Sequence, residues 1–310
     1  MDKGIHFIDR KKQNIFLVIV LPILVLFTIV GSSYDLEISH SLYLGETFDS
    51  NFFGILFSYI GIIPTFLGWT FLGSSILALT REREIENKKR KWLVILSVFL
   101  IVLSFFFFCN TLFMVNESSF SVHWLLAYSI WIVCISLTFM GGYKMAQRSN
   151  EKDLLKHILF ITAISIITMI MVMIIKEITD RPRYRFVSEE NTEYFKNWWQ
   201  SGRHIEKDNM VKITANEFSS FPSGHSAYSM FAIFIFPLIA EYNDKLKKYK
   251  SAFFFVGLIW WLLTAFSRIT VGAHYLTDVS VGGIVVIFSY LITWLISNCI
   301  NKKAKNVNRQ

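Results

Sequence analysis

The sequence has few cysteines for its length. Only three occur among 310 residues, Cys109, Cys134 and Cys299, and each lies within or at the end of an apolar run. They form no Cys-x-x-Cys pair and no spaced framework, which argues against a disulfide-stapled domain and against the usual cysteine zinc site. We expect each cysteine to be a small buried hydrophobic residue.

Charged residues are also scarce, at 17% of the chain, whereas hydrophobic residues make up 53% and the mean hydropathy is +0.45. A soluble domain of this length carries more charge, so this composition is typical of a protein that lies in a lipid bilayer. The formal net charge of +8 does not indicate nucleic acid as a partner, because membrane proteins gather Lys and Arg in cytoplasmic loops.

Long apolar runs, in contrast, are abundant, and a membrane-spanning helix needs about 20 mostly apolar residues. We expect an all-α fold, a polytopic membrane helix bundle with about eight transmembrane helices. The first run follows basic residues, as a signal peptide would, but it is long for one and no Ala-x-Ala cleavage site follows it. The eight runs are residues 15–33, 52–79, 92–115, 124–143, 158–175, 222–240, 252–267 and 278–299.

The segments between these runs alternate in basic charge. The two tails and the loops 80–91, 144–157 and 241–251 hold 22 of the 31 Lys and Arg residues. The alternate loops 34–51, 116–123 and 269–277 hold none. Because basic loops stay in the cytoplasm, we expect both termini there, with residues 300–310 as a cytoplasmic tail.

The segment 176–221 breaks this alternation. The same topology places it outside, yet it carries eight Lys and Arg residues, three of them in the stretch RPRYRF, residues 181–186. These charges are on the wrong side to orient the chain. They are therefore candidates for binding an anion, or for meeting lipid phosphates at the membrane surface.

Three short segments return to this outer face at helix ends. They are KEITDRPR, residues 176–183, FPSGHS, residues 221–226, and SRITVGAHYLTD, residues 267–278. Because each lies at a helix end on the same side of the bilayer, we expect them to meet in one pocket. No acidic cluster of the kind that holds two metal ions accompanies them, which agrees with a site that uses no metal and no other cofactor.

The residues of this pocket suit a phosphoryl group. Lys176, Arg183 and Arg268 supply fixed positive charge and many N–H donors. Ser223 and Gly224 stand at a predicted helix start, where backbone N–H groups and the helix dipole favour an anion. Glycine also lets the backbone come close to a ligand without a side chain in the way.

Two histidines complete the predicted site. His274 and Asp278 are four residues apart, which places them on one helix face, so the carboxylate can orient the imidazole and stabilise its charged form. An oriented imidazole can attack phosphorus as a nucleophile. His225 is the remaining titratable group and can protonate the leaving oxygen and then activate a water.

The three segments resemble the motifs of the type 2 phosphatidic acid phosphatase (PAP2) superfamily of integral membrane lipid phosphatases. Those motifs are Lys-x6-Arg-Pro, Pro-Ser-Gly-His and Ser-Arg-x5-His-x3-Asp. The resemblance implies phosphate-binding roles for Lys176, Arg183, Ser223, Gly224, Ser267 and Arg268, and catalytic roles for His274, His225 and Asp278. The second and third motifs match in full, at Pro222, Ser223, Gly224 and His225 and at Ser267, Arg268, His274 and Asp278.

The first motif leaves an alternative open. Arg183 lies at the right spacing from Lys176, but Tyr184 follows it where the family has proline. Arg181 is followed by Pro182, but then only four residues separate it from Lys176. We favour Arg183 because the spacing sets the helix-to-loop geometry, and we keep Arg181 as a possible phosphate-binding residue.

The resemblance divides the chain into three parts. We expect residues 1–91 to form a tail and two transmembrane helices, and residues 92–299 to form a six-helix phosphatase core with the outer loop 176–221. The alternative is that the helix pair within 92–143 is the insertion, because the segment from Tyr34 to Gly61 also resembles the family's opening loop and second helix.

The resemblance implies a metal-independent membrane lipid phosphatase, acting at the outer face of the cell membrane through a phosphohistidine intermediate. Its substrate would be a phosphomonoester or diphosphate such as undecaprenyl diphosphate, phosphatidylglycerol phosphate or phosphatidic acid. The alternatives are a lipid phosphotransferase that passes the phosphoryl group to another lipid, and an anion-binding membrane transporter. The sequence names neither the lipid nor the oligomeric state.

Overall fold

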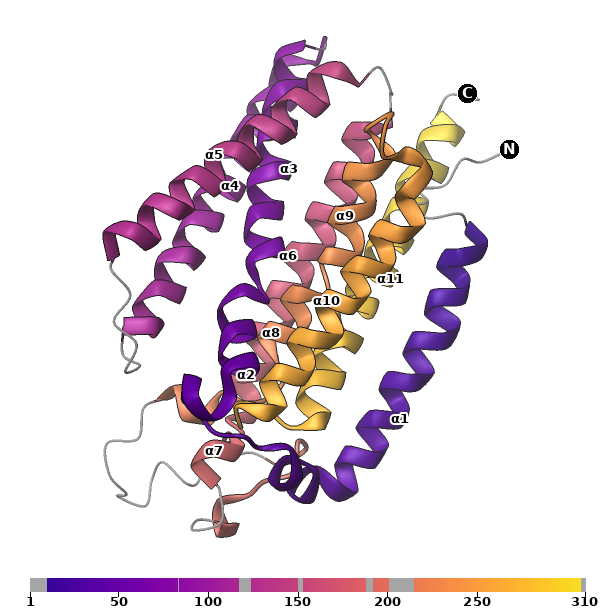
Figure 1. Cartoon of the computed structure of the whole chain (residues 1–310). Coiled ribbons are helices and arrows are strands. Elements are labelled where there is room, and N and C mark those ends of the chain that lie inside the picture. The colour runs from indigo at the N-terminus through magenta and orange to yellow at the C-terminus, as the bar shows by residue number, and fades with distance from the viewer. Residues whose placement is uncertain are drawn as a thin grey trace. The chain divides into compact units, whose positions relative to one another are not determined.

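The computed structural model describes residues 10–82, 84–116, 124–149, 153–187, 192–200 and 215–307. Within these ranges the chain is all-α, as predicted, and contains no strand. The elements are α1 (Arg10–Leu42), α2 (Phe48–Ile60), α3 (Ile63–Glu82), α4 (Asn87–Asn116), α5 (Trp124–Arg148), α6 (Leu154–Thr179), α7 (Tyr184–Val187), η1 (Thr192–Tyr194), η2 (Ala215–Phe218), α8 (Gly224–Ser229), α9 (Ala232–Glu241), η3 (Lys247–Tyr249), α10 (Lys250–Thr270) and α11 (Leu276–Val307) (Figure 1).

Five stretches of the described chain are long and apolar enough to cross a membrane. They correspond to the first, second, fifth, seventh and eighth of the predicted runs. The third and fourth runs lie within the long helices α4 and α5. The five stretches are Ile19–Leu42, Asp49–Arg81, Leu154–Val187, Lys247–Thr270 and Leu276–Ile300.

Two predicted spans are interrupted in the structure. The run 52–79 divides into α2 and α3, and Pro64 is the second residue of α3. A proline disfavours helix in the residue before it and is tolerated in the first turn, so the new helix begins beside it. The run 222–240 consists of α8 and α9, which are separated at Met230 and Phe231.

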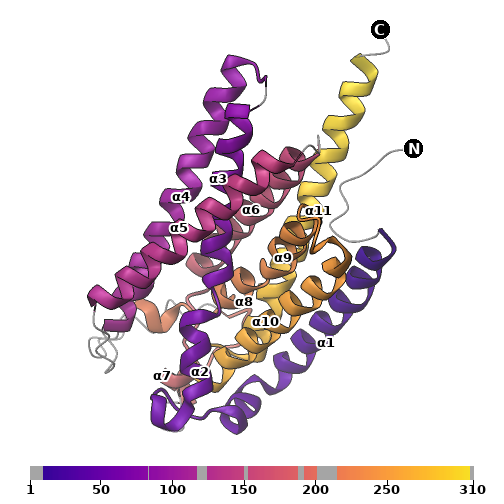
Figure 2. The same cartoon turned by 45° about the horizontal axis from the view of Figure 1, so that its top comes forward.

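The chain folds into two compact units. The first contains residues 63–162 and 231–255, and the second contains residues 8–62, 163–230 and 256–310. In the first unit, α3 packs against α4 and α5 (Figures 1 and 2). Serine hydroxyls donate hydrogen bonds to backbone carbonyls across these interfaces, and small residues of this kind let the helices approach closely. The bonds run from Ser97 to Gly73 at 2.7 Å, from Ser104 to Phe66 at 2.7 Å and from Ser75 to Gly142 at 3.0 Å.

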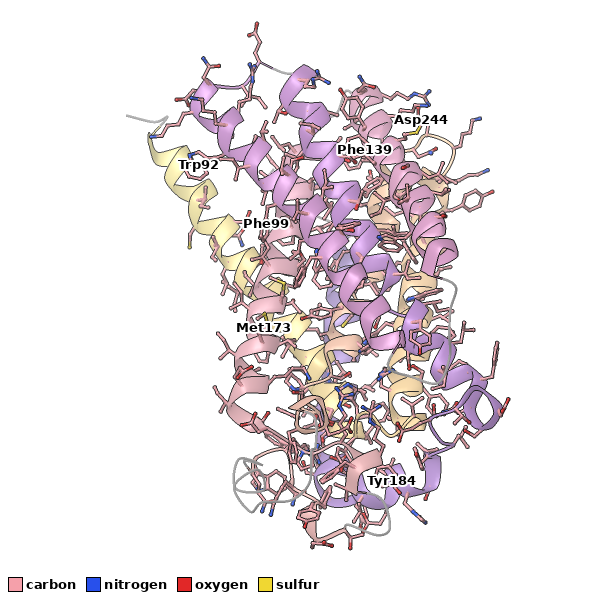
Figure 3. All side chains as sticks on the ribbon, turned by 90° about the vertical axis from the view of Figure 1, so that its left-hand side faces the viewer. Trp92, Phe99, Phe139, Met173, Tyr184 and Asp244 are labelled. Carbon is pink, nitrogen blue, oxygen red and sulfur yellow. The ribbon has the colours of Figure 1, made fainter. Side chains whose placement is uncertain are left out.

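The outward surfaces of the helices are apolar, as expected for contact with lipid. Trp92 and Phe99 are exposed along α4, and Met173 is exposed in the C-terminal third of α6 (Figure 3). The prediction that the cysteines are buried is wrong for Cys299, which is exposed, and Cys134 is half-buried. Apolar side chains of a membrane helix can face lipid instead of protein, so an apolar cysteine need not be buried within the protein. The side chain of Cys109 lies outside the described residues.

In the second unit, α1 runs antiparallel to α11 and packs along it, and α8 also packs against α11 (Figures 1 and 2). The end of α1 and the loop between α10 and α11 meet, since the Leu44 N–H donates to the Thr270 carbonyl at 2.9 Å. The segment after α6 joins them through the Arg185 N–H, which donates to the Gly272 carbonyl at 2.8 Å. Four helix ends therefore gather at one end of this unit, where Tyr184 is labelled in Figure 3.

Candidate active site

The three predicted segments are in contact at this end of the second unit. The Ser223 N–H donates to the Asp278 carbonyl at 2.9 Å, which joins the start of α8 to the start of α11. The Ser220 N–H donates to the Arg181 carbonyl at 3.0 Å. The Lys176 ammonium, in the last turn of α6, donates to the Ser219 carbonyl. Residues far apart in the sequence therefore surround one small volume.

His274 lies in the loop between α10 and α11 and is only 2% exposed. Its Nδ1 lies 2.6 Å from the backbone carbonyl of Ser220. A carbonyl oxygen only accepts, so Nδ1 carries the hydrogen and donates it. In the neutral imidazole the lone pair is then on Nε2, which is the atom left to act as a nucleophile.

Asp278, on the first turn of α11, is fully buried behind this imidazole. Its Oδ2 lies 3.7 Å from His274 Nδ1, beyond hydrogen-bond range, and accepts from the Ser220 hydroxyl at 2.5 Å and the Tyr275 N–H at 2.9 Å. The predicted orientation of the imidazole by the carboxylate is therefore indirect. Asp278 fixes Ser220, and the Ser220 carbonyl fixes His274.

The surroundings of His274 favour its neutral form. The pKa of its imidazole is lowered to about 3, chiefly by burial and also by the nearby charges of Arg183 and Lys176, whereas Asp278 raises it. The same interactions place the positive charges of Arg183 and Lys176 close to the imidazole. A neutral imidazole is the nucleophilic form, so the site holds His274 ready to react near neutral pH.

His225, the second residue of α8, contacts a residue that the sequence motifs do not include. Its Nε2 lies 3.1 Å from the backbone carbonyl of Ser58 on α2. Nε2 therefore carries a hydrogen and donates it, because the carbonyl only accepts. The imidazole can act as an acid only after Nδ1 has also taken up a proton.

Arg268, near the end of α10, contacts the same α2 residue. One of its terminal nitrogens donates to the Ser58 hydroxyl. Its Nε is buried and has no hydrogen-bond partner within the described chain. A buried donor without a partner is costly, and a bound anion is one ligand that removes the cost.

Lys176 and Gly224 are neighbours in space. A Cβ placed on Gly224 would lie 3.9 Å from the Lys176 Cε and 3.5 Å from the nearest atom, a ring carbon of Tyr228. These are ordinary contacts, so packing within the protein does not require glycine here. The packing is compatible with the predicted reason for glycine, which is that a ligand approaches the backbone closely.

Two predicted phosphate-binding serines are already hydrogen-bonded within the protein. The Ser223 hydroxyl caps α8 by accepting from the Ser226 N–H at 3.2 Å, and its own hydrogen remains able to donate. The Ser267 hydroxyl donates to the Thr264 carbonyl at 2.7 Å. Its single hydrogen is therefore used, and a phosphate-binding role for Ser267 stays a prediction.

The three arginines of RPRYRF have different surroundings. The Arg181 side chain is fully buried and pairs with Asp278 at 2.6 Å and with Asp35 at 2.9 Å. Arg185 pairs with Glu217 and, at 3.4 Å, with Glu46. Arg183 is 9% exposed and acts electrostatically on His274. A phosphate-binding role for Arg183 stays a prediction.

Sequence reasoning missed two residues that reach this region from outside the motifs. Asp35 lies about two turns before the end of α1, and Ser58 lies on α2. A signal for Asp35 exists, because a carboxylate at the end of an apolar span is costly and commonly functional. Ser58 has none, because a lone serine in an apolar helix is usually bonded to its own backbone.

The described residues contain no group of three or more His, Cys, Asp or Glu side chains that could hold a metal ion. The carboxylates of this region are used in other ways, since Asp35 and Asp278 both pair with Arg181. The donor set of the site is cationic, and it suits an anion better than a cation.

Comparison with known proteins agrees with this geometry. Residues 154–305 match the model of the PAP2 superfamily, a stretch that contains all three motifs, the elements from α6 to α10 and all but the last two residues of α11. This match confirms the resemblance to the PAP2 superfamily that is seen in the sequence. No curated protein and no solved structure matches the chain.

Proposed function

We propose that this protein is a metal-independent membrane lipid phosphatase that works through a phosphohistidine on His274. Membership of the PAP2 superfamily implies phosphatase or phosphotransferase activity on phosphate esters. One observation carries the finer proposal. The Nδ1 hydrogen of the buried His274 is bonded to the Ser220 carbonyl, so Nε2 is the nucleophilic atom in a cationic site.

The phosphoryl group lies among Lys176, Arg183 and Arg268. Arg268 supplies the buried Nε–H that has no partner within the described chain, and Lys176 supplies a compact charge beside Gly224. These cations stabilise the negative charge on the equatorial oxygens in the transition state, which is most of what phosphoryl transfer requires. Ser223 donates its hydroxyl hydrogen.

The first chemical step forms the phosphohistidine. His274 Nε2 attacks phosphorus, the bond from phosphorus to the lipid oxygen breaks, and that oxygen takes a proton from the imidazolium of His225. The positive charge that develops on the His274 ring is stabilised by the nearby Asp278. His225 acquires its proton together with the substrate, whose negative charge offsets the neighbouring arginines.

The second step releases phosphate. Water attacks phosphorus on the side opposite the His274 nitrogen, His225 takes the proton of that water, and the phosphorus–nitrogen bond breaks. Inorganic phosphate leaves, His274 returns to its neutral form, and His225 is again an imidazolium. The cycle consumes one water and needs no metal ion or redox cofactor.

The substrate is a lipid at the outer face of a cell membrane. The apolar helix surfaces suit a lipid tail, and the site lies at an end of its unit where the segments 34–51 and 269–277 hold no Lys or Arg. Absence of basic residues from these segments favours an extracytoplasmic position for them, and both termini are then cytoplasmic.

The test is phosphate release by the purified protein in detergent and EDTA. The panel is undecaprenyl diphosphate, phosphatidylglycerol phosphate and phosphatidic acid, with His274→Ala as the control. We expect release from at least one lipid, absent in the control. Release that requires an added lipid acceptor would favour a phosphotransferase. Activity that EDTA removes and added metal restores would contradict the proposal, and binding of phosphate without turnover would favour a transporter.

A further inference from the structure

A second charged cluster lies behind His274 and consists of Asp35, Arg181, Thr277 and Asp278. All four side chains are at most 2% exposed. They come from α1, from the segment after α6 and from the first turn of α11. A substrate that enters from solvent or lipid does not reach these groups, so the cluster acts through its neighbours.

The donors of Arg181 are used within the protein. One terminal nitrogen donates to Asp278 Oδ1 at 2.6 Å and to the Thr277 hydroxyl at 2.8 Å, and the other donates to Asp35 Oδ2 at 2.9 Å. Its Nε donates to the Lys196 carbonyl at 2.8 Å. The guanidinium also lies 4.0 Å from the ring centre of Tyr275. Arg181 is thereby fixed in position and orientation.

Asp35 is built into the same cluster as an anion. It accepts from Arg181, from the Thr277 N–H at 3.1 Å and from the Thr277 hydroxyl. Each of these groups donates to it, as an ionised carboxylate requires. Gly31, one turn earlier on α1, leaves the room for this contact, because a Cβ there would lie 2.7 Å from Asp35 Oδ1 and from Thr277.

A continuous line of contacts leads from this cluster to the nucleophile. Arg181 holds Oδ1 of Asp278, and Oδ2 of the same carboxylate holds the Ser220 hydroxyl at 2.5 Å. The Ser220 carbonyl accepts the Nδ1 hydrogen of His274 at 2.6 Å. Movement of Arg181 would therefore change the orientation of the imidazole.

The cluster also acts on His274 through its net charge. Arg181 and Asp278 alone would neutralise each other, but Asp35 adds a second carboxylate, and the three groups carry one net negative charge. That charge lies behind the imidazole, which becomes positive when Nε2 bonds to phosphorus. The cluster therefore stabilises the charged ring more than the neutral one, which is what lowers a barrier.

We propose that Asp35 and Arg181 are positioning residues for His274, which set the orientation and the charge of Asp278 behind the nucleophile. This inference rests on the proposed phosphohistidine chemistry. It gives Arg181 a role distinct from phosphate binding. It also makes α1, which precedes the matched region 154–305, part of the catalytic apparatus.

The test is Asp35→Asn in the full chain, compared with Ser39→Ala as a control. Ser39 lies one turn further along α1, is also buried and has no side-chain partner within the described chain. We expect Asp35→Asn to lower kcat by about tenfold to a hundredfold and to leave KM within about twofold, because the phosphate ligands are untouched. Ser39→Ala should change neither.

A double-mutant cycle separates this role from a merely structural one. If Asp35 acts through Asp278, Asp35→Asn should have little further effect on kcat in an Asp278→Asn background. An equal loss in both backgrounds, or an unchanged kcat with a lowered unfolding temperature, would overturn the inference. If Asp35→Asn does not fold, Thr277→Val keeps both charges and should give a smaller kcat loss at unchanged KM, whereas an unchanged kcat there would also overturn it.

The His274→Ala variant distinguishes failure of this inference from failure of the proposed function. If His274→Ala is inactive and Asp35→Asn is fully active, the phosphohistidine chemistry stands and the positioning role falls. If His274→Ala remains active, the proposed function itself fails.

Discussion

At the scale of single residues, the reactivity that we propose for His274 follows from one hydrogen bond and from its buried surroundings. The Ser220 carbonyl fixes its tautomer, and burial with nearby positive charge keeps it neutral. A neutral imidazole with its hydrogen on Nδ1 presents Nε2 to phosphorus without any proton transfer. The imidazole is therefore held directly by the Ser220 carbonyl, and Asp278 acts on it through Ser220.

The first prediction concerns the protonation of His274. Its pKa in the folded protein is about 3, below the value of about 6.5 for an exposed histidine. Between these values the unfolded chain binds a proton that the folded chain does not, so this residue lowers stability as the pH falls from about 6.5 towards 3. We expect ¹⁵N NMR of the free protein to show neutral His274 at pH 5.

Thermal unfolding gives a second measure of the same property. Between pH 7 and pH 5, the unfolding temperature of wild type should fall further than that of His274→Gln, which has no group to protonate at this position. An imidazolium signal for His274 at pH 5, or equal losses in the two proteins, would contradict the buried neutral imidazole.

The second prediction separates the arginines of RPRYRF. Arg183→Ala should lower kcat/KM by about a hundredfold or more, because it removes a charge beside the transferred phosphoryl group. Arg185→Ala should stay within about threefold of wild type, since its partly exposed pairs with Glu217 and Glu46 hold the loop. Steady-state kinetics of the two variants checks this. A larger loss at Arg185 would reverse the assignment.

Much of the candidate site could be predicted from the sequence, because the motif residues carry distinctive chemistry at fixed spacing. The roles of individual residues could not be predicted as well. The spacing favoured Arg183, but the proline after Arg181 left that alternative open, and the burial and ion pairs of Arg181 distinguish the two. The contributions of Asp35 and Ser58 depend on which helices pack beside the motifs, which a local pattern does not contain.

At the scale of helices, the packing of α3 against α5 depends on one of two adjacent glycines. A Cβ on Gly142 would lie 2.4 Å from the Ser74 hydroxyl and 2.5 Å from the Phe71 carbonyl, whereas a Cβ on Gly141 would meet nothing within 4 Å. Both residues are glycines on α5, so the same substitution at each position gives a matched pair of variants.

The third prediction uses this pair. Gly142→Ala should destabilise the protein by about 1–3 kcal/mol, because the interface is overpacked. Gly141→Ala should be neutral or stabilising by up to about 1 kcal/mol, since alanine favours helix. Thermal unfolding in one detergent compares them directly, and equal effects would argue against the close contact between α3 and α5.

The apolar runs predicted the helices well, but not their interruptions. The break between α2 and α3 follows from Pro64. The prediction of one helix over 52–79 rested on hydropathy and did not take this proline into account. The division of the run 222–240 into α8 and α9 has no equivalent local signal. Both interruptions bear on the site, because α2 carries Ser58 and α8 carries His225.

At the scale of the whole molecule, the compact units suggest which helices are additional to the family core. The unit that contains the site includes α1 and α2, and Asp35 and Ser58 contact motif residues within it. Helices α4 and α5 belong to the other unit. We therefore propose that the pair within 92–143 is the insertion, in preference to residues 1–91.

The fourth prediction concerns the sidedness of the site. In a cysteine-free background, Gln200→Cys should react with a membrane-impermeant thiol reagent added outside intact cells, because it follows the segment that carries Arg181 and Arg183. Glu86→Cys, in the basic loop 80–91, should react only after the membrane is opened. Both side chains are exposed, so access to the reagent is matched. The opposite labelling pattern would place the site in the cytoplasm.

The central claim is that phosphate passes through His274, and trapping the intermediate tests it most directly. Protein mixed with a lipid substrate labelled with ³²P at its terminal phosphate should be quenched after milliseconds and digested. We predict a label that is stable in base and labile in acid, located on the peptide containing His274 and absent from His274→Ala. Full hydrolytic activity with no labelled peptide in wild type, or a label that persists in His274→Ala, would contradict the account.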